Sequence, residues 1–268
     1  MGRNRVAELG FRAFAGDRAS PVILHVPHAS RHVTPAARAS IVLDDDALVA
    51  ELDRMTDAYT DLIAERAARA AATTPWRFVN QASRLVVDPE RFCDPAAEEM
   101  TTVGMGAVYT RTSHGEVLRA DDATVAEQLL AAHFRPYARA MTDLVNERLA
   151  AHGRAVIIDV HSYPSAPLPY ELYGRDPRPP VCLGTDAAHT PGWLADAARD
   201  AFAGLGVGWN TPFAGCYVPL EQYGRDDRVA ALMVEIRRDT YMVEPAGAPT
   251  VGLDAVVGAL AALVDAAS

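Results

Sequence analysis

A short apolar run in the middle of the chain constrains the fold most, because it has to be buried. Residues Ala155–Ile158 are apolar and largely β-branched, which is typical of a buried strand. The run leads into Asp159 and His161, and Pro164 stops it. Ligands of open α/β sheets gather outside the carboxyl ends of strands, so we expect His161 at that edge. Asp159 projects from the same face and is expected to hold the second nitrogen of the imidazole.

A second stretch, far away in sequence, has the same layout. Pro21 begins a short apolar strand, Pro27 ends it, and His28 is the first residue after the stop. One histidine at a strand end is equally compatible with a core side chain that is hydrogen-bonded to a neighbour. Two of them, with acidic residues between, fit a three-ligand catalytic zinc site that leaves one coordination position open. His25, which alternates with His28 on the strand, is expected in the core.

Length and composition favour one α/β domain over residues 1–268. Half of the residues are hydrophobic, which predicts a globular chain, and the net charge of −10 argues against a general nucleic-acid surface. Cys93, Cys182 and Cys216 show no metal or disulfide spacing, which suits a reducing cytoplasm. Residues 1–6 lack an apolar core long enough for a signal peptide, and no apolar run reaches membrane-spanning length. We therefore expect a cytoplasmic protein that contacts no membrane.

Strands alternate with helices along the chain, which predicts one sheet covered on both faces. Asp44–Ala72 is predicted to be helical because its apolar residues recur at three- and four-residue steps. Cys93–Arg119 is predicted to be irregular, as in a mobile flap over a site. The other predicted elements are a helix over Asp121–His152 that Pro136 kinks or splits, helices over 191–204 and 250–267, and strands over Arg77–Asn80, Leu85–Asp88, Val181–Thr185 and Ala230–Arg237.

Glu235 is a carboxylate inside an otherwise apolar strand, where burial is costly unless the charge is paired or used. One interpretation is a structural ion pair with Arg237 or Arg84. The other is a general base beside a metal-bound water, which takes a proton and passes it to a leaving amine.

Arg84 and Arg91 flank a short apolar segment, and their guanidinium groups are suited to bidentate binding of a substrate carboxylate. Salt bridges to Asp88 and Glu90 are the alternative for both. His114 lies in the predicted flap and is a candidate for contact with substrate.

The third metal ligand is left open by the sequence pattern. Its candidates are Glu51, Asp53 and Asp57, which all lie in the first predicted helix. On a continuous helix Asp57 points away from the apolar stripe, as a solvated carboxylate does. If a second helix begins near Thr56 as its cap, Asp57 falls in the first turn and faces the edge of the sheet.

Six ordered blocks between Pro21 and about Glu244 resemble the N-formylglutamate amidohydrolase family. Val26–Ser30 is similar to its Val-Pro-His-Ser/Thr-Gly motif, and Asp57–Asp61 to its Asp-Trp-x-Thr-Asp motif. The other blocks are Ser83–Arg91, similar to Arg-x-Val-x-Asp-Leu-Asn-Arg, Asp159–Ser162, similar to Asp-x-His-Ser, Cys182–Thr185 and Val234–Met242. Pro89-Glu90 replaces the usual Leu-Asn of this family, and Met233 stands near a common Gln.

The resemblance implies a three-layer α/β fold like that of zinc carboxypeptidases and other zinc exopeptidases, with a mixed, mostly parallel sheet flanked by helices. It also implies His28, Asp57 and His161 as zinc ligands and Glu235 as the base. Arg84 and Arg91 would then bind substrate carboxylates.

We therefore expect zinc-dependent hydrolysis of the amide of an N-formyl or N-acyl amino acid, and first of all the conversion of N-formyl-L-glutamate to L-glutamate and formate. The expected partner is a small anionic substrate. The alternatives are a zinc peptidase or amidase acting on a larger peptide or cell-wall fragment, and a metal-free binding domain on the same fold.

Overall fold

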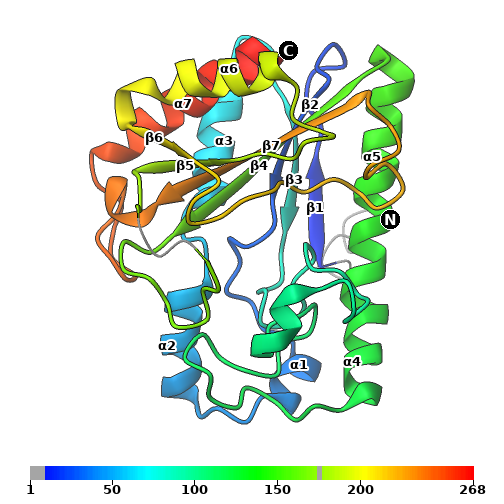
Figure 1. Cartoon of the computed structure of the whole chain (residues 1–268), viewed down its shortest axis with the longest axis vertical. Helices are drawn as coiled ribbons and strands as arrows, with labels where there is room; N and C mark the ends of the chain where they lie inside the picture. Colours follow the sequence, from blue (N-terminus) through cyan, green and yellow to red (C-terminus); the bar gives the residue numbers. More distant parts are fainter. Residues whose placement is uncertain (1–9, 174–176) are drawn as a thin grey trace, which may run out of the picture.

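The computed structural model describes residues 10–173 and 177–268. The expectation of no signal peptide rests on residues 1–6, which lie outside the described residues. The described chain is built around a seven-stranded sheet with the order β1-β3-β2-β4-β7-β5-β6 (Figure 1). The strands are β1 Phe11–Phe14, β2 Val22–Val26, β3 Trp76–Asn80, β4 Ala155–Tyr163, β5 Val181–Gly184, β6 Val207–Trp209 and β7 Val229–Arg237. Strands β3, β2, β4 and β7 run parallel, whereas β1 and β5 are antiparallel to β3 and β7. The predicted mixed, mostly parallel sheet is confirmed.

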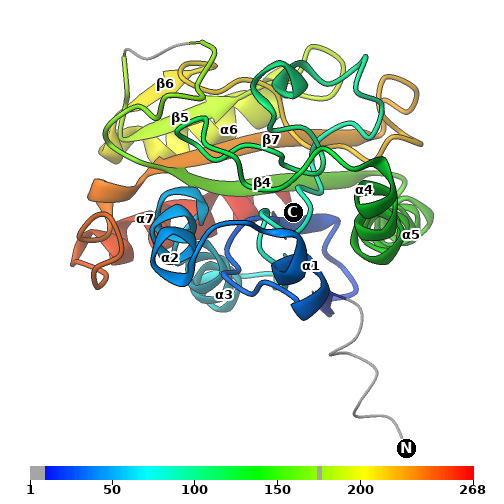
Figure 2. The same ribbon diagram turned by 90° about the horizontal axis from the view of Figure 1, so that it is seen from below.

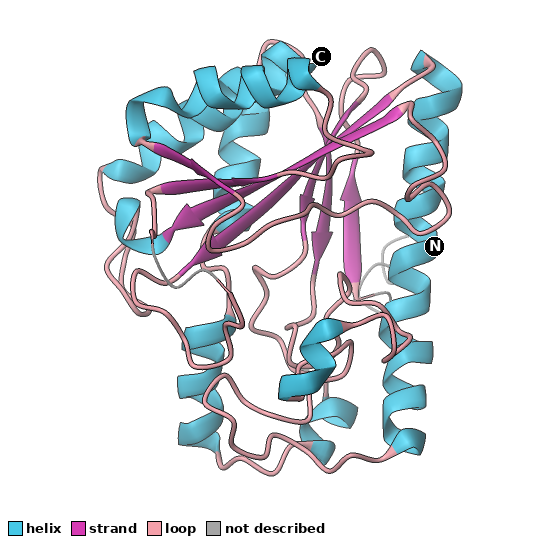
Figure 3. Ribbon diagram, in the orientation of Figure 1, coloured by secondary structure: helices cyan, strands magenta, loops and turns pink. Residues whose placement is uncertain are grey.

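Helices cover both faces of this sheet, which confirms the predicted three layers (Figure 3). The α-helices are α1 Pro35–Ser40, α2 Asp45–Met55, α3 Thr60–Ala70, α4 Ala123–Leu129, α5 Arg135–His152, α6 Gly192–Phe202 and α7 Gly252–Ala267. Helices α3, α6 and α7 share a core with Val156 and Ile158 of β4, whereas α5 packs with Ala155 and Ile157. Strand β4 is therefore apolar on both sides because it is covered on both sides.

The alternation of side chains along the strands gathers the polar residues on one face. His25, Asp159, His161 and Glu235 have the same parity as Ile157, so they face the side of the sheet that α5 covers. In the register of the sheet, His25 lies opposite Asp159, and His161 lies opposite Glu235. The segments that were expected to carry the chemistry are thus hydrogen-bonded neighbours.

The carboxyl ends of β2, β3 and β4 point toward a group of helices and connecting segments. Figure 1 shows α1, α2 and the segment that precedes α4 below the sheet, beyond these strand ends. Figure 2 looks up at the same segments from below, with β4 and β7 running side by side behind them. This end of the sheet is where a ligand site is expected in an α/β fold.

Of the two interpretations of Asp44–Ala72, the continuous helix is wrong: α2 ends at Met55, and the second helix, α3, begins at Thr60 rather than near Thr56. Long-range bonds hold the break. The Arg238 guanidinium donates to the carbonyls of Asp53 and Arg54 at 3.2 and 2.9 Å, at the end of α2. The backbone N–H of Asp57 donates to the carbonyl of His28 at 3.0 Å. Tyr59 then enters α3 with a left-handed φ of 65°.

The predicted strand over Leu85–Asp88 is also wrong, because this segment forms turns. Leu85 and Val86 are fully buried, but in two small clusters outside the sheet, so burial without strand pairing explains the apolar run. The predicted flap is packed in part, since Met105, Tyr109 and Leu118 are buried in the cluster that also contains residues of α2.

Pro136 splits the long helix as predicted. Helix α4 passes through a π-helical turn at Leu130–Phe134 into α5, and the proline stands in the first turn of α5. Phe134 and Arg135 are themselves helical, so the proline lies at a π-helical interruption of a longer helix and not at a free helix end. Among the helices of residues 10–173 and 177–268, none combines the length and the apolar character that crossing a bilayer requires.

Candidate active site

A cavity of about 890 Å³ opens at the carboxyl end of the central strands. Its wall includes His28 from the loop after β2, Asp57 from the break between α2 and α3, His161 from β4 and Glu235 from β7. Four separate segments therefore contribute polar side chains to one hollow.

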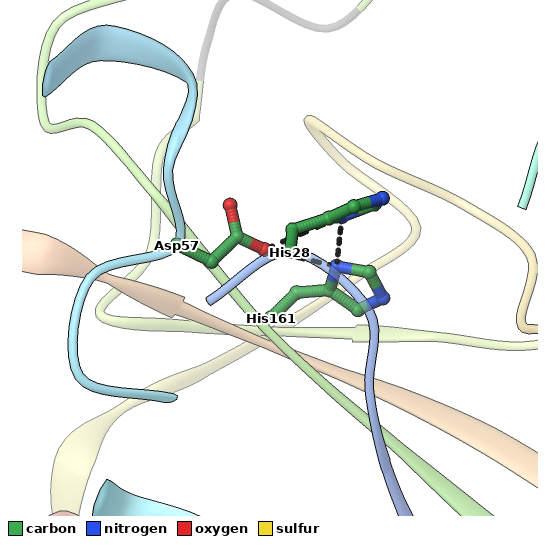
Figure 4. Close-up of side chains that lie close together, drawn as sticks. All are labelled: His28, Asp57 and His161. Atoms are coloured by element: carbon green, nitrogen blue, oxygen red, sulfur yellow. Dashed lines mark hydrogen bonds and ion pairs between the residues drawn. The ribbon is translucent and has the colours of Figure 1, made fainter. Parts of the chain in front are cut away.

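Three side chains converge on a single point in this cavity (Figure 4). The Nδ1 atoms of His28 and His161 are 3.2 Å apart. The Oδ2 atom of Asp57 lies 3.1 Å from Nδ1 of His161 and 3.6 Å from Nδ1 of His28. All three residues are buried, at 2–3% exposure. Two imidazole nitrogens and one carboxylate oxygen thus surround a single point in the wall of the cavity.

Further carboxylates lie behind the two imidazoles. Nε2 of His28 is 2.9 Å from Oδ1 of Asp88, and Nε2 of His161 is 3.0 Å from Oδ1 of Asp159. The second contact is close but is not aligned as a hydrogen bond, so within the described residues Nε2 of His161 has no hydrogen-bond partner. A carboxylate behind an imidazole favours a proton on Nε2 and leaves the Nδ1 lone pair for the central point.

Asp159 belongs to a wider buried network. Its Oδ1 lies 2.8 Å from Nδ1 of His25, whose Nε2 lies 2.6 Å from the Tyr137 hydroxyl. The backbone N–H of Tyr217 donates to its Oδ2 at 3.2 Å. The prediction that His25 is a core residue is confirmed, since it is fully buried and both ring nitrogens have partners.

The electrostatics of the triad favour a positive charge at the central point. Burial alone would raise the pKa of Asp57, but hydrogen bonds to His161 and His28 hold it far below its usual value. Burial alone would lower the pKa of His161, but the carboxylates of Asp159 and Glu90 bring it well above its usual value. The carboxylates therefore stabilise positive charge on the two imidazoles, or a cation between them.

The donor set matches the requirements of a zinc ion. Donors at zinc–nitrogen distances of about 2.0–2.1 Å are about 3.3 Å apart in a tetrahedral site, and the three atoms here are separated by 3.1, 3.2 and 3.6 Å. Two neutral imidazoles and one carboxylate are also a ligand set found in catalytic zinc sites. His28, Asp57 and His161 could therefore hold a metal ion.

Two further donor groups of the described residues both include Glu90, and the one that also contains Asp88 shares His28 with the triad. The charges around the cavity favour a single divalent ion. Among the described residues, the carboxylates of Asp57, Asp88, Glu90 and Asp159 lie within reach of three guanidinium groups, those of Arg84, Arg91 and Arg238. These four negative and three positive groups sum to −1, so one divalent cation brings the sum to +1, whereas two would bring it to +3.

Glu235 stands next to the triad without a partner. Its side chain is buried, and within the described residues its Oε2 has no hydrogen bond and its carboxylate forms no ion pair. Arg237 pairs with Asp239 and Arg84 pairs with Asp88, so the structural ion pair proposed for Glu235 is wrong. Burial raises the pKa of Glu235 to about 8, with His161 opposing the shift and Asp57 adding to it. A carboxyl group with such a pKa can both accept and donate a proton near neutrality.

Arg84 and Arg91 both face the cavity and both contact Asp88, as the salt-bridge alternative expects. Nη2 of Arg84 lies 2.7 Å from Asp88, and its Nε donates to the hydroxyl of Tyr109 at 3.0 Å. Arg91 is more loosely held, since its Nε is 3.6 Å from Asp88 and its Nη1 is 3.8 Å from Glu98. Its side chain is 26% exposed, against 12% for that of Arg84, so Arg91 is the more accessible of the two to a ligand.

The structure does not bring every candidate to the site. The carboxylate of Asp53 pairs with Arg31 at 2.5 Å, and that of Glu51 accepts bonds from the N–H and hydroxyl of Ser113 at 2.6 and 2.9 Å. His114 lines a separate, smaller cavity of about 530 Å³ and is absent from the wall of the larger one. Of the three acidic candidates, Asp57 alone lies beside the histidines.

Glu51 has a structural role that can be tested. Glu51→Ala removes the acceptor of the buried Ser113 N–H, and leaving a buried donor unsatisfied costs about 1–3 kcal/mol of unfolding free energy. Urea unfolding of the two proteins measures this loss. Glu116→Ala, at an exposed position in the same segment, is the control and should change the value by less than about 0.5 kcal/mol.

Sequence reasoning missed three residues of the cavity wall or its support. Asp88 appeared only as a salt-bridge partner of arginine, although it also contacts His28. Arg238 is buried, with its Nη2 3.8 Å from Asp57. Glu90 has its Oε2 3.3 Å from Nε2 of His161 and 3.6 Å from Nε2 of His28. The sequence does show many charged residues around these buried apolar segments. That pattern does not indicate which way each side chain points.

Comparisons with known proteins identify the family and support the fold. The family model described as N-formylglutamate amidohydrolase matches residues 20–242. Among solved structures, the chain is similar to N-formylglutamate amidohydrolase from Ralstonia eutropha JMP134, with a TM-score of 0.78, 22% identity and 96% of each chain covered. It is also similar to a gene product from Agrobacterium tumefaciens, with a TM-score of 0.68, 20% identity and coverage of 98% of this chain and 96% of that one. A comparison with curated proteins found no significant match. The two structures support the fold, and the family model, which spans most of the sequence, shows that the chain belongs to the N-formylglutamate amidohydrolase family.

Proposed function

We propose that this chain hydrolyses the amide bond of an N-acyl amino acid with the help of one zinc ion, and that N-formyl-L-glutamate is the first substrate to test. One observation carries the proposal. Three donor atoms from His28, Asp57 and His161 meet within 3.6 Å of one another, and the unpartnered carboxyl group of Glu235 lies on the strand beside them. Family membership supports amide hydrolysis as the reaction class.

A bound divalent ion supplies a polarised carbonyl and an acidified water in such a site. The chain's own residues provide the proton transfers. Glu235, whose pKa burial raises to about 8, accepts a proton from the attacking water and returns it to the nitrogen of the departing amine. The oxygen of the water enters the carboxylic acid product. One of its two protons goes to the amine, and the other remains with the acid.

The arginines hold the amino-acid half of the substrate. Arg84 and Arg91 line the cavity, and a guanidinium fork binds a carboxylate by two parallel hydrogen bonds. Arg91 is the more exposed of the two and offers the first contact, while the hydrogen bond between Arg84 and Asp88 holds the Arg84 guanidinium in place. An acidic substrate thus finds a local positive patch on a chain whose net charge is −10.

The proposal is tested by removing the metal with a chelator and assaying formate release from N-formyl-L-glutamate before and after zinc is restored. We expect activity to be lost on chelation and to return at one zinc ion per chain. Protein that takes up zinc and cleaves peptides, but no N-formyl or N-acyl amino acid, would support the peptidase alternative. Protein that takes up no zinc would support the binding-domain alternative.

A further inference from the structure

Each imidazole of the triad has a second ring nitrogen, and the partner of that nitrogen decides how the ring is held. In Figure 4 the Nε2 atoms of His28 and His161 point away from Asp57. Nε2 of His28 forms a hydrogen bond of 2.9 Å with Oδ1 of Asp88. Nε2 of His161 is buried, and in the part of the chain that the structure describes it has no aligned hydrogen-bond partner. One proposed zinc ligand therefore lacks the support that the other has.

Asp159 is the nearest carboxylate to Nε2 of His161, but each of its oxygens already accepts another hydrogen bond. Its Oδ1 lies 3.0 Å from Nε2 of His161 and 2.8 Å from Nδ1 of His25. A carboxylate can only accept, so Nδ1 carries the proton of a neutral His25, and its Nε2 accepts from the Tyr137 hydroxyl at 2.6 Å. The backbone N–H of Tyr217 donates to Oδ2 of Asp159 at 3.2 Å. The Asp159 carboxylate is therefore oriented by the His25 network and by Tyr217.

Glu90 brings a second carboxylate to the same nitrogen. Its Oε2 lies 3.3 Å from Nε2 of His161, and its buried Oε1 has no hydrogen-bond partner among the described residues. The ion pairs that Glu90 forms there are with histidines only, whereas Asp88 is also paired with Arg84. Leaving a buried donor and a buried acceptor unpaired costs free energy, so a small rotation that joins Glu90 to His161 is favoured.

One short segment then supports both proposed histidine ligands. Oδ1 of Asp88 accepts from Nε2 of His28 at 2.9 Å and from the backbone N–H of Glu90 at 3.2 Å. Arg84 holds the other carboxylate oxygen of Asp88 at 2.7 Å. The segment is thus fixed at Asp88, and two residues later it places the carboxylate of Glu90 beside His161.

We propose that Glu90 is a positioning residue of the metal site. Its carboxylate accepts a hydrogen bond from Nε2–H of His161 and so keeps the Nδ1 lone pair of that ring directed at the ion. This inference rests on zinc binding by the triad, which is part of the proposed function. It adds a residue that touches neither the ion nor the reacting atoms and acts through His161.

The first test is the zinc affinity of two variants. Loss of the partner of a metal-binding histidine typically weakens metal binding by about 10–100-fold, and we expect this loss for Glu90→Ala. Glu90→Gln keeps an acceptor oxygen and should recover most of the loss. Competition with a chromophoric chelator measures the dissociation constants without a substrate. Thermal unfolding of the metal-free variants checks that each remains folded.

Glu221→Ala is the matched control for the loss of charge. Glu221 also lines the cavity, but it is exposed and forms no ion pair with any residue that the structure describes. The charge of an exposed carboxylate is screened by solvent and salt. Its removal should therefore leave the zinc dissociation constant within about twofold of the wild-type value.

The ring protons give a second readout that identifies the histidine concerned. In zinc-loaded protein with isotopically labelled histidine, Glu90→Ala should shift or broaden the nuclear magnetic resonance signal of Nε2–H of His161. The corresponding signal of His28 should stay in place, because Asp88 still holds that ring. A general loss of stability or charge would instead disturb both signals.

The outcomes separate this inference from the proposed function. Weaker zinc binding by Glu90→Ala, recovered by Glu90→Gln and accompanied by a change at His161 alone, supports the inference. The inference is overturned if Glu90→Ala binds zinc as tightly as Glu221→Ala does, if Glu90→Gln is as weak as Glu90→Ala, or if both ring signals move. Each of these results leaves the proposed function intact. Wild-type protein that takes up no zinc overturns both.

Discussion

Glu235→Gln is expected to lower kcat by roughly 10³–10⁴-fold, near the upper end of what a positioned acid–base group contributes. The magnitude follows from its two tasks, because the same carboxyl group takes the proton from water and returns it to the amine. Glutamine keeps the shape of the side chain but cannot carry the proton. Since Glu235 is no part of the converging triad, zinc content should stay at that of the wild-type protein.

The measurement is kcat at saturating substrate, together with metal content, on zinc-loaded protein. Glu221→Gln makes the same chemical change on another carboxylate of the cavity wall and should leave kcat within about twofold. Wild-type kcat in Glu235→Gln would remove Glu235 from the acid–base role. Loss of zinc from this variant would instead place its carboxylate in the metal site.

His161→Ala is expected to weaken zinc binding by about 10²–10³-fold, the share of one ligand when the total binding free energy of about 10–16 kcal/mol is divided among four. Activity at limiting zinc should be lost in parallel. Competition with a chromophoric chelator measures the dissociation constant directly and needs no substrate. His32→Ala, at an exposed position, is the control and should bind zinc as the wild-type protein does.

The acidic ligand is tested by the pair Asp57→Asn and Asp53→Asn in the same competition assay. Both changes remove one negative charge, but Asp57 lies 3.1 Å from His161, whereas Asp53 pairs with Arg31. We expect Asp57→Asn alone to weaken zinc binding, by a factor similar to that for His161→Ala. Equal affinities for the two variants would show that Asp57 is no ligand.

The central strands could be predicted because their apolar sequence matches their buried environment. Strands β4 and β7 are buried on both faces, so the apolar runs over Ala155–Ile158 and Ala230–Val234 identify them directly. His161 and Glu235 stand out as polar interruptions of those runs. That His161 lies opposite Glu235 could not be predicted from the sequence of either strand, because it depends on the order of the strands in the sheet.

The local pattern allows a second helix to begin near Thr56 but does not decide between one helix and two. Thr56–Tyr59 contains neither glycine nor proline, and the apolar steps continue on both sides of it. The break depends on partners distant in sequence: Arg238 binds the carbonyls at the end of α2, and the hydroxyl of Tyr59 donates to the carbonyl of Gly247 at 3.1 Å. The same reasoning accounts for His114, whose place beyond the cavity is fixed by the contact of Ser113 with Glu51.

The hydrogen bond from the N–H of Asp57 to the carbonyl of His28 ties together the main chains that carry two of the converging donors. Folding alone therefore closes the segment between His28 and Asp57 into a loop. Metal binding then does not have to reduce the conformational freedom of that segment. Protein stripped of metal should then keep its shape around the empty position and reload in a single bimolecular step, with a rate proportional to ion concentration and no slow rearrangement afterwards.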